Sequence, residues 1–159
     1  MNSKWIELSL SITIFLSGLS GGIGFFTAMG GNPAMVKLSD RSFAEYWQQI
    51  DNFMGARMPV FGPLLLCSLM ISTVLLFKEW RSPSFWLMLT ACFAVIGDIA
   101  FTLNVNHPLN KLIQSWDLNN LPANVQQIKI KVIQAFNIRL LLMIGSFVLV
   151  VLSVWSRKK

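Results

Sequence analysis

The chain has 159 residues, of which 54% are hydrophobic and only 13% are charged, and its formal net charge is +6. With twelve Phe, six Trp and only two Cys, this composition excludes an ordinary soluble domain, intrinsic disorder and a disulfide-stabilised scaffold. The basic residues lie in small groups beside apolar segments, which indicates membrane topology rather than nucleic-acid binding.

Four charge-poor segments are long enough to cross a bilayer as helices, since about twenty residues at 1.5 Å each span the hydrocarbon. They run from about residue 8 to 29, 58 to 77, 83 to 105 and 138 to 155. These segments lack the alternation that is typical of barrel strands. The sequence therefore predicts one all-α membrane domain over residues 1–159, an integral membrane antiparallel four-helix bundle.

The distribution of Lys and Arg predicts that both termini face the cytoplasm. Basic residues are dense near the termini and in the short second connection, namely Lys4, Lys78, Arg81, Arg157, Lys158 and Lys159. Four tryptophans lie at the same ends of the spans: Trp5, Trp80, Trp86 and Trp155. We expect the first span to be retained rather than cleaved as a signal peptide. In a bacterium this topology places the chain in the inner membrane.

The first span carries small residues on its surface. Gly18 and Gly22 form a GxxxG spacing, and Gly21 lies beside them. Such residues let a neighbouring helix approach closely, either within the bundle or in a homo-oligomer. The alternative is that the missing side chains of Gly18, Gly21 and Gly22 leave room for a flat ligand in the outer half of the bilayer.

The first long connection, from Gly30 to Arg57, is expected to cover the outer mouth of the bundle. Between Ser39 and Met54, apolar residues recur at helical spacing, which predicts an additional amphipathic helix in this extracytoplasmic connection. Ser42 followed by Glu45 has the form of a capping box at its start. No helix breaker follows Pro122, so the last helix should begin well before its span.

Two ionisable residues are expected in the outer half of the membrane. The third span runs outward and the fourth starts outside, which places Asp98 and Arg139 at a similar depth. An unpaired charge there is costly, whereas a pair that shares hydrogen bonds persists. The pair is either a structural ion pair that fixes helix register or part of a functional site. Asp98, Thr102 and Asn106 recur every four residues, so this polar face should point inward.

The densest polar group in the sequence surrounds the outer end of the third span. Pro108 is expected to end the helix there and to form a turn whose carbonyl groups need partners. His107, the only histidine, could accept a proton or supply the one axial ligand that haem requires, and a helix cap is the structural alternative. No spacing of Cys, His or acidic residues predicts a metal site. The candidate ligand-binding residues in this group are Asn104, Asn106, Asn110, Trp116 and Asn137.

Several short motifs together resemble one known family. They are the small-residue stretch Ser17–Gly24 followed by Pro33, the stretch leading to Asn52 and Pro59, the Asn-rich segment Asn104–Asn110 with Trp116, and the start of the last span at Phe136–Arg139. The most specific of them is the Asn-x-Pro-x-Asn pattern at Asn106–Asn110. Over most of its length the chain resembles the DUF1772 or anthrone oxygenase-like family of small four-span membrane proteins.

The resemblance implies oxygenation of an anthrone to an anthraquinone, without a known metal or flavin. An anthrone must first lose a proton beside an aromatic carbonyl, which requires a base and a group that stabilises the oxyanion. On this hypothesis His107 or Asp98 accepts the proton, and Arg139 stabilises the oxyanion together with Asn106 or Asn137. The expected partners are membrane lipid and a lipophilic small molecule.

A non-enzymatic function is the alternative. The same bundle could bind a quinone, a lipid or haem, because cofactor sites between helices combine an apolar cavity with a few polar groups. It could also act as a structural partner in a larger membrane assembly. Turnover of a substrate would separate these functions from that of an oxygenase.

Overall fold

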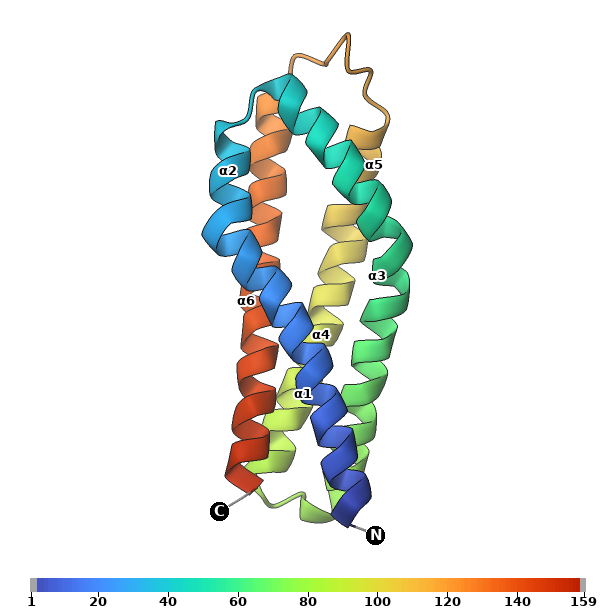
Figure 1. The fold of residues 1–159 in the computed structure, drawn as a ribbon, viewed down its shortest axis with the longest axis vertical. Coiled ribbons are helices and arrows are strands. Elements are labelled where there is room, and N and C mark those ends of the chain that lie inside the picture. Colours follow the sequence, from blue (N-terminus) through green and yellow to red (C-terminus); the bar gives the residue numbers. More distant parts are fainter. Residues whose placement is uncertain (1–2, 158–159) are drawn as a thin grey trace.

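The computed structural model describes residues 3–157, which form four long helical rods running alternately up and down (Figure 1). The first rod is α1 (Ser3–Phe26), the π-helical turn η1 (Thr27–Gly31) and α2 (Asn32–Lys37), and the second is α3 (Asp40–Leu76) with the 3-10 turn η2 (Phe77–Glu79). The third is α4 (Pro83–Phe101), the π-helical turn η3 (Thr102–Asn106) and α5 (His107–Gln114), and the fourth is α6 (Val125–Arg157). The described residues contain no strand, which confirms the all-α bundle.

All four rods are long and apolar enough to cross a membrane, and each contains one of the predicted spans. By length and composition the chain is therefore an integral membrane protein. Ser3 and Arg157 lie at the same end of the bundle, which we call the inner end, and the connection between α5 and α6 lies at the outer end (Figure 1). As predicted, α6 begins well before the span that it contains.

The rods are longer than the hydrocarbon layer is thick. They contain between 32 and 40 residues, which corresponds to roughly 48–60 Å of helix against about 30 Å of hydrocarbon. Two apolar clusters are stacked along this length. The inner core includes Leu69, Leu76, Met88, Ala91 and Val150, and the outer core includes Phe43, Trp47, Ile113, Val125 and Val132.

A buried lysine ties the outer core together. The ammonium group of Lys129 on α6 donates to the carbonyl oxygen of Leu38 at 2.5 Å, in the corner between α2 and α3. It also lies 5.7 Å from the ring centroid of Phe43, so it binds both a backbone oxygen and an aromatic face. This contact fixes the corner against α6, and both residues lie outside the predicted spans.

The amphipathic stretch in the first connection is helical, as predicted, and it buries Phe43, Ala44 and Trp47. It is not a separate helix lying across the mouth, because α3 continues from Asp40 into the second span without a break. Its cap is also one turn earlier than predicted, since the Ser39 hydroxyl accepts from the amide of Ser42. Two prolines inside α3 remove backbone donors without ending the helix, and Figure 1 shows that α3 changes direction along its length.

The predicted turn at Asn104–Asn110 is wrong, because Pro108 does not end its helix. The π turn η3 directly precedes it, and the amide of His107 bonds to the carbonyl of Thr102, five residues earlier. The same arrangement occurs in the first rod, where the amide of Asn32 bonds to Thr27 just before a proline. A π turn shifts the hydrogen-bond register from four residues to five, so the helix continues past a residue that has no N–H.

Glycines let α1 pack closely against α6, but not in the predicted GxxxG pattern. A Cβ atom on Gly18 or Gly21 would meet the side chain of Phe147, and one on Gly24 would meet Met143 and Ile144. A Cβ atom on Gly22 would meet nothing within 4 Å. The glycines of α1 that face α6 are therefore spaced three residues apart. The crossing angle of the two helices determines this spacing.

This packing predicts that Gly21 and Gly22 differ in their tolerance of a side chain. In Gly21→Ala the new Cβ atom would lie 3.1 Å from the Cβ atom of Phe147, so Phe147 must move by a few tenths of an ångström. We expect the free energy of unfolding in detergent to fall by about 1–3 kcal/mol. Gly22→Ala is the matched control and should be neutral or stabilise by up to about 1 kcal/mol. Equal destabilisation of the two variants would contradict this account of the α1–α6 contact.

Candidate functional site

Polar side chains gather between the inner core and the outer core. They come from α2, from α4 with its π turn η3, and from α6, and their spread from Asp98 to Asn106 along one rod corresponds to about 12 Å. We call this group the polar layer, and it comprises Asn32, Asp98, Thr102, Asn106, Asn137 and Arg139. Four of these six residues were candidate site residues in the sequence.

An ion pair joins α4 to α6 in this layer. The Nε atom of Arg139 donates to one carboxylate oxygen of Asp98 at 2.8 Å, and an Nη atom donates to the other at 3.3 Å. The side chains are only 14% and 16% exposed. Arg139 lies sixteen residues before Trp155 on the same helix, so the pair is about 24 Å from the inner aromatic belt. The expected pairing is therefore confirmed, and both residues lie within the predicted spans.

Arg139 keeps donors for a further partner. A guanidinium group has five N–H groups, and among residues 3–157 only Asp98 accepts from this one, through two of them. The guanidinium carbon lies 5.3 Å from the ring centroid of Phe136, and that ring meets Trp47 edge to face with centroids 5.4 Å apart. The carboxylate and the aromatic ring thus hold the guanidinium in place while three N–H groups remain available.

Three side-chain oxygens of the polar layer are buried without a hydrogen-bond partner: Asn32 Oδ1, Thr102 Oγ1 and Asn106 Oδ1. Asn106 is 2% exposed and Asn32 is 6% exposed. An unsatisfied buried polar group costs about 1–3 kcal/mol, so each such group calls for an explanation. Thr102 and Asn106 both lie in the π turn η3, and π turns are frequent at functional sites. These three oxygens are therefore available to form hydrogen bonds with a ligand.

Asn32 was missed in the sequence. Its side-chain amide donates to Asn137 Oδ1 at 2.7 Å, which joins α2 to α6. A signal was present, since Asn32 precedes Pro33 just as His107 precedes Pro108.

The other candidate site residues from the sequence lie outside the polar layer. His107 is exposed at the start of α5, and Asn104 is exposed with its amide donating to the carbonyl of Ala100 in the same rod. Trp116 packs against the outer core. Gly18 and Gly21 contact Phe147, so their missing side chains are used by helix packing. Of the sequence candidates, Asp98 and Arg139 are therefore in direct contact. Asn137 lies two residues before Arg139 on α6, and Asn106 lies eight residues beyond Asp98 on the third rod.

Asn110 belongs to a network that fixes α5 against α3. Its side-chain amide donates to Asp51 Oδ1 at 2.5 Å, and its oxygen accepts from the Trp47 indole at 3.2 Å. Gln114 donates to the other Asp51 oxygen at 3.2 Å. Trp47 also contacts Phe136, on which Arg139 stacks. Asp51, which sequence reasoning missed, therefore supports the wall beside the ion pair.

Metal ligands do not cluster in the part of the chain that the structure describes, where no three His, Cys, Asp or Glu side chains could hold an ion. A histidine ligand for haem would be His107, the only histidine. Because that imidazole is exposed, haem would bind at the surface of α5 rather than in the polar layer. The buried polar atoms of the layer do not fit such a ligand.

Comparison with known proteins gives one match. A family model described as anthrone oxygenase matches residues 52–149, more than half of the chain. The matched segment includes Asp98, Asn106, Asn137 and Arg139. No curated protein and no solved structure gives a significant match.

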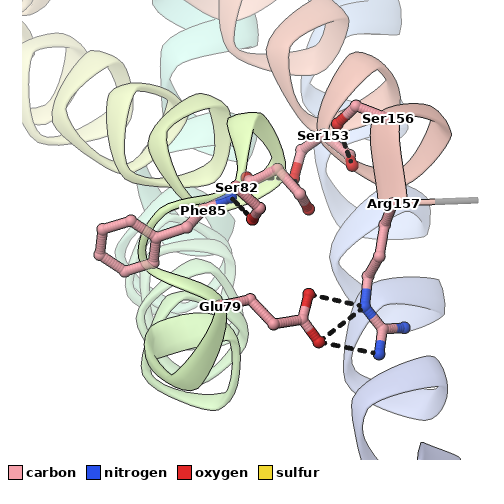
Figure 2. Close-up of polar contacts among 7 residues, drawn as sticks. Glu79, Ser82, Phe85, Ser153, Ser156 and Arg157 are labelled. Carbon is pink, nitrogen blue, oxygen red and sulfur yellow. Dashed lines mark hydrogen bonds and ion pairs between the residues drawn. The ribbon is translucent and has the colours of Figure 1, made fainter. Parts of the chain in front are cut away.

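Burial of the Asp98–Arg139 pair predicts a strong dependence of stability on both partners. Asp98→Ala would leave Arg139 buried without its counterion, and the free energy of unfolding should fall by about 3–5 kcal/mol. The matched control is Glu79→Ala at the inner end, where Arg157 pairs with Glu79 at 3.2 Å (Figure 2). That pair is more exposed, so its loss should cost about 0–1 kcal/mol. Unfolding in detergent would measure both, and similar losses would contradict the different roles of the two pairs.

Proposed function

The chain belongs to the anthrone oxygenase family, and on that premise we propose that it oxygenates a flat, lipophilic aromatic of the anthrone type at the polar layer. Two observations carry the proposal. The Asp98–Arg139 pair is largely buried, and the neighbouring turns of the first and third rods hold three side-chain oxygens that are buried without a partner. A lipophilic substrate would reach this layer through the bilayer, since both residues of the ion pair lie within the predicted spans.

The reaction sets clear chemical demands. It converts the methylene carbon of the anthrone into a second carbonyl, with O2 as the oxidant and water as the other product. A base first removes a proton from the methylene carbon, and the negative charge moves to the carbonyl oxygen as an enolate. The enolate gives electrons to O2 as the new C–O bond forms, the resulting peroxide anion takes the proton back from the base, and the hydroperoxide then loses water. The protein must supply the base and stabilise the enolate oxygen.

Arg139 is the proposed stabiliser of the enolate oxygen. Its remaining N–H groups can donate to an oxygen beside Asp98, and its contacts with Asp98 and Phe136 hold the guanidinium in position before the substrate binds. A preorganised donor acts more strongly in a site with little water, because the effective dielectric is low. Asn106 and Thr102 would bind further polar groups of the substrate.

Asp98 is the proposed base. It lies in the same layer as Arg139, on the helix that also carries Thr102 and Asn106. His107 is the competing candidate, but its exposed side chain lies beyond the layer, nine residues further along the rod. Asp98 would take the proton from the methylene carbon while Arg139 receives the charge that develops on the oxygen.

The proposed location is a bacterial inner membrane with both termini in the cytoplasm. Lys4, Lys78, Arg81 and Arg157 lie at the inner end, and this density of short-loop basic residues supports the orientation. Tryptophans at the same end are exposed, from 49% for Trp80 to 63% for Trp5, as expected for an interfacial belt.

Oxygen uptake by the detergent-purified protein with an added anthrone tests the function. Arg139→Lys keeps the charge but loses the planar fork, so kcat should fall roughly tenfold to a hundredfold. Arg57→Lys is the matched control, since Arg57 also stacks on a phenylalanine, at 5.4 Å from the Phe53 ring, but is exposed. It should leave kcat unchanged.

A second comparison in the same assay identifies the base. His107→Gln should keep most of the activity, whereas Asp98→Asn should abolish it. Loss of activity in His107→Gln with a folded protein would make His107 the base instead. Absence of uptake in the wild-type protein, together with a visible absorbance band from a bound ligand, would favour a non-enzymatic ligand-binding protein.

Topology is tested separately by reporter fusions. With both termini in the cytoplasm, a fluorescent protein fused after residue 159 should fluoresce. Alkaline phosphatase inserted between residues 117 and 122, in the outer connection, should be active only if that connection is extracytoplasmic. The reverse pattern of reporter activity would show that both termini lie outside the cytoplasm.

A further inference from the structure

An apolar groove runs between α1 and α3 in the inner half of the bundle. Its volume is about 460 Å³, within the range of small-molecule sites. One wall is formed by Trp5, Leu8 and Ile12 of α1, and the other by Leu64, Ile71 and Leu75 of α3. Most of these side chains are exposed on the surface of the bundle, and none of the lining residues belongs to the polar layer.

Two lysines extend the walls of the groove toward the inner end. Lys4 precedes Leu8 by four residues, and Lys78 follows Leu75 by three. Residues three or four apart share a helix face, so each lysine lies one turn beyond the groove on the same side as its lining. Both lysines are exposed. Two cations from different helices therefore flank the inner end of one apolar groove.

The carboxylates at this end leave the two lysines uncompensated. Glu79 accepts from Arg157 through both oxygens, as Figure 2 shows, and Glu7 already has an interaction partner. Neither Lys4 nor Lys78 has an ion pair within the described range 3–157. The inner end is thus apolar along the groove and positive at its mouth.

We propose that this groove binds an anionic phospholipid of the leaflet at the inner end. One acyl chain lies between α1 and α3, and the phosphate of the headgroup lies between Lys4 and Lys78. Basic residues at a membrane surface attract anionic headgroups, which matches the position of both lysines. A second copy of the chain fits less well, because a symmetric contact through this face would bring lysines of like charge together.

Native mass spectrometry of the full chain, released from detergent with added phosphatidylglycerol or phosphatidylcholine of identical acyl chains, tests the proposal. The wild-type protein should retain phosphatidylglycerol in preference to phosphatidylcholine. The double variant Lys4→Gln/Lys78→Gln should lose roughly fivefold of that preference per lysine. The matched control Lys37→Gln/Lys111→Gln changes the net charge equally at exposed outer positions and should keep the preference.

A second pair of variants tests the groove itself. Cys67 lines the groove and is exposed, so Cys67→Phe should fill it and weaken the retention of both lipids severalfold. Val74→Phe places the same ring on an exposed position of α3 outside the groove and should have no effect.

Three outcomes would overturn the proposal. They are an unchanged headgroup preference in Lys4→Gln/Lys78→Gln, wild-type retention in Cys67→Phe, and a dimer that Cys67→Phe converts into a monomer without loss of lipid.

Discussion

The mismatch between the length of the rods and the thickness of the bilayer governs the arrangement of this chain. Because helices of 32 to 40 residues cannot be contained in about 30 Å of hydrocarbon, part of each rod must pack outside it. There, helix association can use the burial of apolar surface from water. The outer core around Phe43, Trp47 and Val132 lies outside the predicted spans and suits this kind of packing. Inside the lipid, contacts depend instead on small residues and hydroxyl groups, such as Gly21 against Phe147 and Thr13 against Ser72.

The polar layer lies between the outer core and the part of the bundle that packs through small residues and hydroxyl groups. The π turns allow this layer to form. Both turns precede a proline, and both keep the rod helical through a residue that has no N–H to donate. In η3 the added residue changes the helix phase between Asp98 and Asn106, and the two oxygens left without partners in the third rod belong to this turn. The π turn η3 thus both keeps the third rod continuous and contains the two side-chain oxygens that lack partners.

Much of this arrangement could be predicted from the sequence, for reasons that differ by feature. The spans were predictable because backbone groups in lipid must bond within their own helix, so charge-poor length implies helix. The Asp98–Arg139 pair was predictable from depth alone, since counting residues along antiparallel helices places both at one level. The helix through Pro108 was not, because the rule that proline ends a helix does not anticipate a π turn. The glycine contacts could not be predicted either. The angle at which α1 crosses α6, and not the sequence spacing, determines that α6 covers Gly21 and leaves Gly22 open.

The same depth argument explains why the ion pair suits the proposed chemistry. An isolated arginine at this level would be strongly disfavoured, so Asp98 is required to hold it there, with Phe136 beneath the guanidinium. When a neutral aromatic substrate loses its methylene proton to that carboxylate, the charge is transferred from the aspartate to the enolate oxygen. The arginine then exchanges one anionic partner for another while the net charge of the layer stays constant. Keeping that net charge constant avoids the desolvation cost that a newly buried enolate would otherwise carry.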